Sequence, residues 1–531
     1  MTTTIAGSTK GFRVNAIIQK QEAARKWRVQ KRLDKFNFPN DLSQPMLRTP
    51  KPRFELAERA VGTSYGGIAL VHDLVRQLGL AKAIDERVHL FKIHLPYHES
   101  DHVLNLAYNA LCAGTCLEDL ELRRQDEAYM NALGAERIPD PTTAGDFCRR
   151  FKRSDLEDLQ AAIDVARRQA WARQPAEFFA EARIEADGTT VATAAECKQG
   201  IDINYKGVWG YHPLVLTLAN TGEVLRLVNR PGNRPSHEGA AHQFDQCIEL
   251  CRSAGFRRIL LRGDTDFSQT THLDRWHAHE DVRFIFGYDC GTTLHILADD
   301  LSNMAWKPLE RSAKYTVKTQ PRVHPERVKQ RIVEERGFKD IRLIDEEVAE
   351  MPYQPTACQH PYRMVVVRKN LLVNDPAQGR LFDDYRYFFY ITNDRELSPA
   401  EIVFSANDRC QQENLLAQLN SARSLHAPVD NLLSNEAYML MTSLAWNLKA
   451  WLALWLPEHE QPGRGLHQQE RQAEKQKLLK LEFRTFVNYF LRIPAQIVKS
   501  GRQLIVRLLG WNTWQPVFFR LAESLHRPQR C

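Results

Sequence analysis

The sequence predicts a mixed α/β fold with an inserted β-rich segment and with α-helical regions at both ends. Three patterns indicate it: helical spacing of apolar residues up to about residue 150, alternating strand and helix patterns from residue 183, and two long apolar helical patterns after residue 398. The chain has 531 residues, of which 43% are hydrophobic and 26% charged. This length and composition fit a soluble globular protein of about two to four domains.

The N-terminal region is predicted to be a basic arm followed by helices. Four prolines between residues 39 and 52 interrupt the arm. From Ile68 to Leu133, apolar residues recur at intervals of three and four, as on one face of a helix. Four cations cluster at 149–153 between short predicted helices. This cluster fits a DNA-reading unit, and ordinary helix packing would give the same pattern.

From residue 183 the pattern changes to strands joined by turns and helices. Residues 183–193 have a strand pattern, and 212–219 and 223–229 form a hairpin around the tight turn NTGE. The chain continues with a helix at 239–255, a strand at 257–264, a helix at 268–279 and a strand at 282–289. This order predicts a three-stranded meander, then strands reached through helical crossovers, the first of which lies beside strand 183–193.

Residues 291–385 break this alternation. The segments 314–320, 339–351 and 362–373 have the pattern of separate short strands with charged turns between them. We therefore predict an inserted β-rich domain here. One more apolar strand is predicted at 385–393.

Two long helices are predicted after the insertion. A Ser-Pro pair opens the first, at 398–425, and the second covers 435–456. The apolar window of the second helix contains Asn447 and Lys449, so a buried helix is favoured over a membrane span. The predicted domains are a basic arm with a helical region (1–150), an α/β core in two parts (151–290 and 386–460), the β-rich insertion (291–385) and a basic helical C-terminal region (461–531).

Charge is distributed unevenly along the chain. Residues 1–53 have a net charge of +9 and residues 461–531 also have +9, whereas the whole chain has +7, so the middle is acidic at −11. Basic ends fit a polyanionic partner, and an acidic centre fits a site where carboxylates gather. The N-terminal sequence has no apolar segment of the kind found in signal peptides, which favours a cytoplasmic protein.

Two aspartates follow the predicted strand 257–264, in the sequence RGDTDF. An Asp at the end of a strand is often only a turn or cap residue, but it is also a metal ligand where other acids lie nearby. Asp264 continues the strand, whereas Asp266 is placed to cap the following helix or to point outward. We therefore choose Asp264 as the candidate ligand.

Asp187 lies inside the first predicted strand of this region, between apolar residues. Burying a carboxylate is unfavourable unless it is paired or bound to a metal. If strand 257–264 lies beside this strand, Asp187 and Asp264 meet at one edge of the sheet and repel each other unless a cation bridges them. A hard cation such as Mg²⁺ prefers such oxygen ligands.

A third acid, Glu413, lies on the predicted helix 398–425, with Arg409 one turn earlier on the same face. An Arg and a Glu four residues apart on a helix are by default a surface pair. The order of the three acids along the chain favours a shared site over that default.

The order of two strand aspartates, a β-rich insertion and Arg-x-x-x-Glu on a helix resembles the DDE transposases of bacterial insertion sequences. The resemblance covers roughly residues 60–460 and includes SDHVLNLAYNALCAGT, LEDLELRRQDEAYMNALG, GYHPLVLTLANTGEVL and LLRGDTDF. It implies a ribonuclease H-like core with a β-strand insertion domain, and a catalytic, metal-binding triad of Asp187, Asp264 and Glu413. It also implies two Mg²⁺ ions, for which Mn²⁺ substitutes.

The family signature, Tyr-x-x-Arg-x-x-x-Glu-x6-Lys, is matched in part. Arg409 matches the signature arginine and is expected to contact DNA. The tyrosine position is Ala406 and the lysine position is Asn420. In the family these two residues are expected near the phosphates of the transposon end, so the departures concern those contacts and not the carboxylate chemistry.

The loop after the hairpin is a candidate DNA contact near the predicted active edge. It contains Arg230, Asn233 and Arg234, which fit either a DNA grip or a solvated loop. Packing in the core is favoured for the nearby side chains of Trp209, Tyr211 and His212.

The resemblance implies a DNA transposase that cuts at the ends of an insertion sequence and joins them to target DNA. Its expected partners are the terminal inverted repeats and target DNA, bound by a homodimer or a larger assembly, with no membrane. The protein is expected in the bacterial cytoplasm, associated with the nucleoid. Two alternatives stay open: a DNA-binding regulator without catalysis, and a ribonuclease H-like nuclease without strand transfer.

Overall fold

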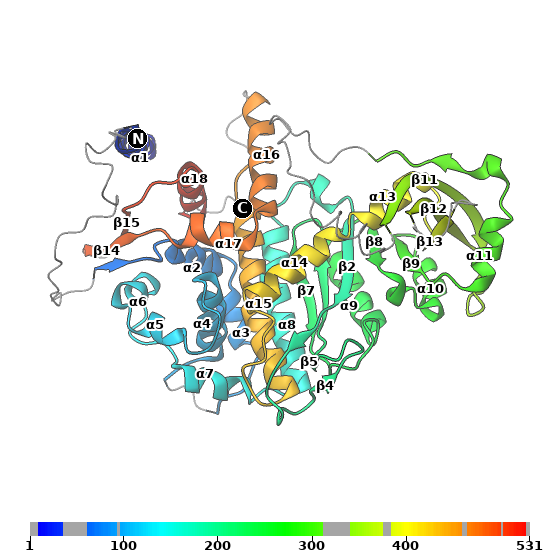
Figure 1. Ribbon diagram of the computed structural model, residues 1–531. Coiled ribbons are helices and arrows are strands. Elements are labelled where there is room, and N and C mark those ends of the chain that lie inside the picture. Colours follow the sequence, from blue (N-terminus) through cyan, green and yellow to red (C-terminus); the bar gives the residue numbers. More distant parts are fainter. Residues whose placement is uncertain are drawn as a thin grey trace, which may run out of the picture. The chain divides into compact units, whose positions relative to one another are not determined.

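The structure is a computed structural model that describes residues 9–34, 61–92, 96–311, 340–374, 384–458, 465–500 and 503–526 (Figure 1). The prolines of the basic arm and the predicted strand at 314–320 lie outside the described residues. The chain forms two compact units, one from residues 1–170, 422–424 and 441–531, the other from 171–421 and 425–440. Among the described helices, none is long and apolar enough to cross a membrane.

The second unit is built on one large mixed sheet. Its strands in chain order are β2 (Ala182–Gly188), β6 (Leu214–Leu218), β7 (Glu223–Val228), β8 (Ile259–Gly263), β9 (Val282–Tyr288), β10 (Lys307–Pro308), β11 (Asp340–Tyr353), β12 (Tyr362–Asn374) and β13 (Asp384–Thr392). Within the described residues they have the spatial order β10-β11-β12-β13-β9-β8-β2-β6-β7.

The predicted meander and crossovers are confirmed. β2 pairs antiparallel with β6, which pairs antiparallel with β7. Two crossovers then return the chain to the sheet, through α9 (Ala240–Ala254) and through the short η2 (Thr265–Phe267) with α10 (Thr270–His277). As a result β8 lies parallel to both β2 and β9. β6 and β8 are buried along their whole length, which explains their mostly apolar sequences, although β6 contains Thr217 and β8 contains Arg262.

The inserted segment is β-rich, as predicted, and the described strands keep the predicted bounds to within two residues, but they are not separate strands and they join the main sheet. β11 and β12 form one long antiparallel hairpin, β12 pairs with β13, and β13 pairs with β9. Charged side chains within the hairpin pair across it: Nε of Arg368 in β12 donates to Glu347 of β11 at 2.6 Å. Between β9 and β11 the described elements are α11 (Thr292–Asp299), η3 (Asn303–Ala305) and the two-residue β10.

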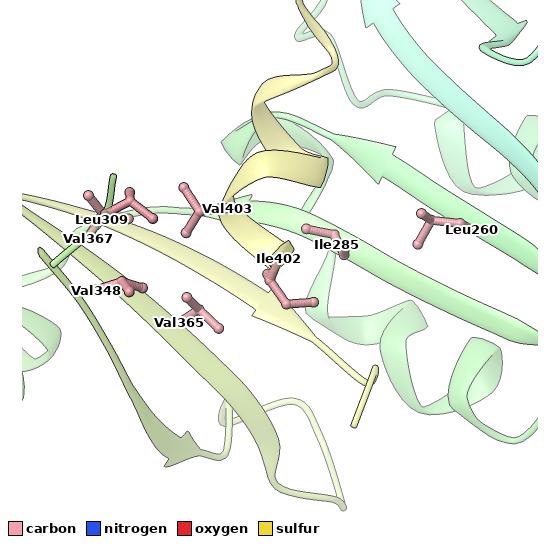
Figure 2. Packing of buried hydrophobic residues seen from close by; sticks show 8 residues of the cluster. All are labelled: Leu260, Ile285, Leu309, Val348, Val365, Val367, Ile402 and Val403. Atoms are coloured by element: carbon pink, nitrogen blue, oxygen red, sulfur yellow. The ribbon is translucent and has the colours of Figure 1, made fainter. Parts of the chain in front are cut away.

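An apolar cluster fixes helix α13 (Pro399–Asn407) on the strands of the sheet. Figure 2 shows Ile402 and Val403 of α13 beside residues of the core strands and of the insertion. Both side chains are fully buried, and burial of such a side chain contributes about 1.5–3 kcal/mol. The other residues of the cluster are the strand residues Leu260, Ile285, Val348, Val365 and Val367, and Leu309, which follows β10.

The predicted long helix at 398–425 is two helices. α13 begins with a capping box formed by Ser398 and Glu401, as the Ser-Pro pair indicates. It ends at Asn407, and α14 (Cys410–Ser421) begins after a turn at Asp408 and Arg409. The prediction of one continuous helix was wrong because no glycine or proline marks this turn. Arg409 therefore lies at the start of α14 rather than inside a helix.

A small sheet that was not predicted follows the end of β2. It consists of β3 (Val191–Ala192), β4 (Asp202–Ile203) and β5 (Trp209–Tyr211), in the order β3-β5-β4. Strands of two or three residues are too short to show a periodic pattern in the sequence.

The first unit is mostly helical, as predicted, but it also contains strands. The described helices are α1 (Thr9–Asp34), α2 (Ile68–Gln77), α3 (Leu80–Asp85), α4 (Glu99–Leu111), α5 (Leu120–Arg124), α6 (Glu127–Leu133), α7 (Pro141–Cys148), α8 (Arg153–Trp171), α16 (Gly465–Lys480), α17 (Phe483–Phe486), the π-helical η4 (Val487–Leu491) and α18 (Gln515–His526). Helix α15 (Leu432–Leu454) contributes to both units.

The prediction of a purely helical C-terminal region was wrong. β14 (Ala495–Ser500) and β15 (Gln503–Leu508) pair antiparallel, and β1 (Gly62–Thr63) pairs with β14. In the sequence, the spacing of arginines between aliphatic residues predicts helices in this region. In β15 the segment QLIVRL instead gives a partly exposed strand, for which its adjacent β-branched Ile505 and Val506 are well suited.

Candidate active site

Asp187 and Asp264 lie at the carboxyl ends of two neighbouring parallel strands. β2 and β8 are in register at Glu185 and Arg262. Each aspartate lies two residues further along the chain, Asp187 within β2 and Asp264 directly after β8. Because side chains two residues apart share a face, the two carboxylates project from the same side of the sheet. The topology that the sequence predicts thus brings these two acids together.

The guanidinium of Arg409 lies between the two carboxylates. Its Nη1 is 3.7 Å from Oδ2 of Asp187, and its Nη2 is 3.8 Å from Oδ2 of Asp264. The side chains of Arg409 and Asp187 are largely buried, at 14% and 15% exposure. Nη1 of Arg409 makes no hydrogen bond within the described residues. The arginine therefore balances charge without a close, directional contact to either acid.

Both aspartates have raised pKa values. Burial raises the pKa of Asp187 to about 6, the charge of Arg409 opposes this rise, and the negative charge of Asp264 adds to it. Burial also raises the pKa of Asp264, again against the charge of Arg409. Two adjacent desolvated carboxylates with one cation between them favour the binding of further positive charge.

Asp264, and not Asp266, faces Arg409. The carboxylate of Asp264 also caps η2 by accepting a hydrogen bond from the amide of Asp266 at 3.0 Å. Asp266 does not cap α10, whose N-cap is Gln269, and it lies exposed, which is the other position that the sequence allowed for it. Gly287 of β9 gives this backbone room, because a Cβ there would lie 2.8 Å from the amide nitrogen of Thr265.

Glu413 lies in the first turn of α14 and lines the same cleft as Asp264 and Arg409. The cleft has a volume of about 530 Å³ and is bordered by aromatic residues of β9 and β13, among them Tyr288 and Tyr390. Glu413 is exposed, and its negative charge contributes to the raised pKa of Asp187 and of Asp264. The third predicted acid thus acts electrostatically on the other two.

The donor set fits a hard divalent cation in its chemistry, since it offers carboxylate oxygens from Asp187, Asp264 and Glu413. Among the described residues, no three His, Cys, Asp or Glu side chains are grouped closely enough to hold a metal ion. In this arrangement Arg409 supplies the positive charge between the aspartates.

Two polar residues, Gln412 and Asn420, hold α14 in place by hydrogen bonds. Gln412 is not among the residues that the sequence singles out, and Asn420 appears there only as a departure from the family signature. Gln412 is buried; its side chain accepts a hydrogen bond from the hydroxyl of Thr217 and donates one to the carbonyl of Val215 at 3.2 Å. Asn420, at the signature lysine position, donates to the hydroxyl of Thr189 at 2.9 Å. The sequence does offer one sign of this role for Gln412, since it is a polar residue at a position that faces the buried side of α14.

Ala406, at the signature tyrosine position, packs against the apolar cluster that holds α13 and also lines the cleft. With Asn420 bound to Thr189, both departures from the signature have structural roles here.

The loop after β7 is organised by Arg230, which is not placed to contact DNA. Its side chain is 6% exposed and donates to the carbonyls of His212, Pro235, Ser236 and Glu238 at 2.7–3.1 Å. Burial lowers the pKa of Arg230 to about 10. The interpretation of Arg230 as a DNA-binding residue is therefore corrected, because its guanidinium serves the loop.

Asn233 and Arg234 of the same loop are exposed, with Arg234 3.5 Å from Glu238. Tyr211 packs in the core, as predicted, and its hydroxyl donates to the carbonyl of Gln199 at 2.7 Å. Trp209, in contrast, is 54% exposed, so the prediction that it is buried was wrong.

Replacing Arg230 by alanine should lower the free energy of unfolding by about 2 kcal/mol, because several carbonyls lose their donor. The matched control, Arg234→Ala, should change it by less than about 0.5 kcal/mol. Urea unfolding of both variants measures this difference. If Arg230→Ala unfolds like the parent and binds DNA more weakly, then Arg230 faces DNA in solution and not the loop.

Comparison with known proteins gives a family match and distant matches among solved structures. A family model described as a transposase DDE domain, group 1, matches residues 60–530. No curated protein matches the chain. Among solved structures, the cryo-EM structure of a piggyBac transposase synaptic complex with hairpin DNA aligns with a TM-score of 0.35 and 9% identity, over 89% of this chain and 87% of that chain. A likeness this weak carries no argument about the fold or the site.

Proposed function

The chain belongs to the family of transposases with a group 1 DDE domain, and on this basis we propose that it cuts DNA at the ends of an insertion sequence and joins those ends to target DNA. The observation that carries the proposal is that Asp187 and Asp264 both lie at the carboxyl ends of the neighbouring parallel strands β2 and β8. Arg409 contacts both acids, and Glu413 faces the same cleft.

We further propose that β7, β6, β2, β8 and β9 form a ribonuclease H-like core. The support is their order, with three antiparallel strands on one side and two parallel crossovers on the other. The division into a DNA-binding region (1–150), a core (151–290 and 386–460), an insertion (291–385) and a basic C-terminal region (461–531) belongs to the same proposal.

In the proposed mechanism Asp187, Asp264 and Glu413 hold divalent cations at the end of the sheet. Two Mg²⁺ or Mn²⁺ ions bound there would activate water, or later a 3′ hydroxyl, and stabilise the charge on the leaving oxygen. The sheet fixes the two aspartates, while α14 brings Glu413. In this proposal Arg409 binds a phosphate oxygen of the DNA strand. Its guanidinium is free to do so because its ion pairs with the two aspartates are long, and because its Nη1 has no hydrogen-bond partner within the described residues.

The proposed DNA surface includes Arg409, Asn233 and Arg234 and the basic ends of the chain. Arg230 is not part of it. The DNA partners are the inverted repeats and the target, bound by a dimer or a larger assembly, and the proposed place of action is the bacterial nucleoid.

The test is to incubate the purified chain with a duplex that carries the element's own ends, with and without Mg²⁺. The proposed function predicts metal-dependent breaks at the ends, followed by joined products when target DNA is added. Binding without any break would favour the DNA-binding regulator. Breaks without joined products would favour a nuclease that lacks strand transfer.

A further inference from the structure

A buried ion pair precedes the two aspartates on strands β2 and β8. Glu185 of β2 and Arg262 of β8 are in register on neighbouring strands, and their side chains are each 1% exposed and in contact. Asp187 and Asp264 follow them by two residues. The pair therefore occupies the same face of the same two strands, one step before the candidate active site.

Arg262 also holds the turn between α13 and α14. Its Nη1 donates to the carbonyl of Ser405 at 2.6 Å, and its Nη2 is 3.6 Å from Oδ2 of Asp408. Nη1 of Arg183 is 3.9 Å from the same carboxylate oxygen. The guanidinium of Arg262 therefore contacts the backbone of the last turn of α13 and the side chain that directly precedes Arg409.

The turn between α13 and α14 needs such a contact because each helix is fixed at a different place. The apolar cluster fixes α13 through Ile402 and Val403, and hydrogen bonds from Gln412 and Asn420 fix α14. The turn at Asp408 and Arg409 lies between these anchors. Without a contact to the sheet, it would be free to shift Arg409 and the start of α14.

Stability alone does not explain the pair. Desolvating two charges is unfavourable, and apolar residues of similar size often replace a buried ion pair without loss of stability. Nε of Arg262 has no hydrogen-bond partner within the described residues, so the arginine is not fully satisfied where it lies. A long, forked side chain is, however, able to contact a carboxylate on one side and a carbonyl on the other.

We propose that Arg262 is a positioning residue, paired with Glu185, which holds the α13–α14 turn so that Arg409 and Glu413 face Asp187 and Asp264. The importance of this position for catalysis rests on the proposed transposase function. The positioning role itself does not depend on that function, because it concerns only how well ordered the α13–α14 turn is.

The test uses the double variant Glu185→Met/Arg262→Met, which removes both charges and keeps the volume. The matched control is Arg258→Met, since Arg258 forms an exposed ion pair with Glu396 at 2.9 Å. Thermal unfolding, binding to the end duplex, Mg²⁺-dependent cleavage and hydrogen–deuterium exchange of residues 404–416 are measured for each protein.

The double variant should melt near the parent's temperature. It should keep most of its affinity for the duplex, because Arg409 is one of several proposed DNA contacts. Its cleavage rate should fall about 30-fold, because a small misplacement of active-site groups is enough for such a loss. Exchange should accelerate about 10-fold at the turn, where the amide of Asp408 donates to the carbonyl of Phe404 and the amide of Gln412 to that of Arg409. The control should match the parent in all four measurements.

Unchanged exchange at residues 404–416 and unchanged cleavage in a folded double variant would overturn the proposal. If the double variant does not fold, Asp408→Asn decides, because Asp408 is 44% exposed and its carboxylate reaches Arg262 from the surface. That variant should show faster exchange at the turn, and unchanged exchange there would reject the positioning role. A parent that never cleaves DNA contradicts the proposed function, while the exchange measurement still tests the positioning.

Discussion

Replacing Asp187 or Asp264 by asparagine should lower the rate of metal-dependent DNA cleavage on the order of 1,000-fold, with little change in DNA binding. Asparagine keeps the shape of each side chain but removes the negative charge that holds a cation. Residues that act together on one reaction step lose most of the rate when any one is removed. The measurement is cleavage of a duplex carrying the element's own ends, at saturating DNA.

Asp266→Asn is the matched control for this prediction. Asp266 lies two residues after Asp264 and is exposed. Its backbone amide donates to Asp264, and its charge only adds to the raised pKa of Asp264. Its variant should cleave within about threefold of the parent. If Asp266→Asn loses cleavage while Asp264→Asn keeps it, the second ligand has been assigned to the wrong aspartate.

Glu413→Gln should also lose cleavage. This variant shows whether Glu413 binds the cations or only affects the two aspartates through its charge. Glu413 is exposed, so its substitution leaves the fold intact. A loss of cleavage similar to that of Asp187→Asn indicates that α14 brings Glu413 to the cations. A variant that cleaves like the parent would leave Glu413 with only the electrostatic effect seen in the structure.

The position of the two aspartates could be predicted because each step depends on a local pattern. Apolar strands around Asp187 and before Asp264 were visible in the sequence. The rule that a crossover returns a strand parallel to its neighbour then placed them side by side, as β2 and β8 are. No long-range contact had to be guessed for this part of the site.

The surroundings of the site could not be predicted because they depend on register and on tertiary contacts. Glu185 and Arg262 are recognisable as a pair only once β2 and β8 are aligned. Arg230 looks like a surface cation in the sequence, and only the fold of its loop turns four carbonyls toward it. The turn before Arg409 has no glycine or proline, so the sequence suggested one helix where the structure has α13 and α14.

Without divalent metal, Asp187→Asn should be more stable than the parent at pH 7.5, by about 3 kcal/mol. The folded protein raises the pKa of Asp187 to about 6 from the ordinary 3.8, a difference of about two units, and each unit corresponds to about 1.4 kcal/mol. Below the ordinary pKa the folded and unfolded forms are both protonated, so nothing is lost. Between the two pKa values the unfolded form releases its proton first, and stability falls with rising pH.

Urea unfolding in chelator at pH 4, 5.5 and 7.5 measures this effect, since the advantage of Asp187→Asn should be small at pH 4 and complete at pH 7.5. Mg²⁺ should then stabilise the parent and not the variant, because only the parent keeps the charge that the cation binds. A parent whose stability relative to Asp187→Asn does not change over this pH range would contradict the desolvated carboxylate. The same burial that makes Asp187 unfavourable in the metal-free fold makes it a strong partner for a cation, so loss of cleavage and gain of stability in one variant would have one physical cause.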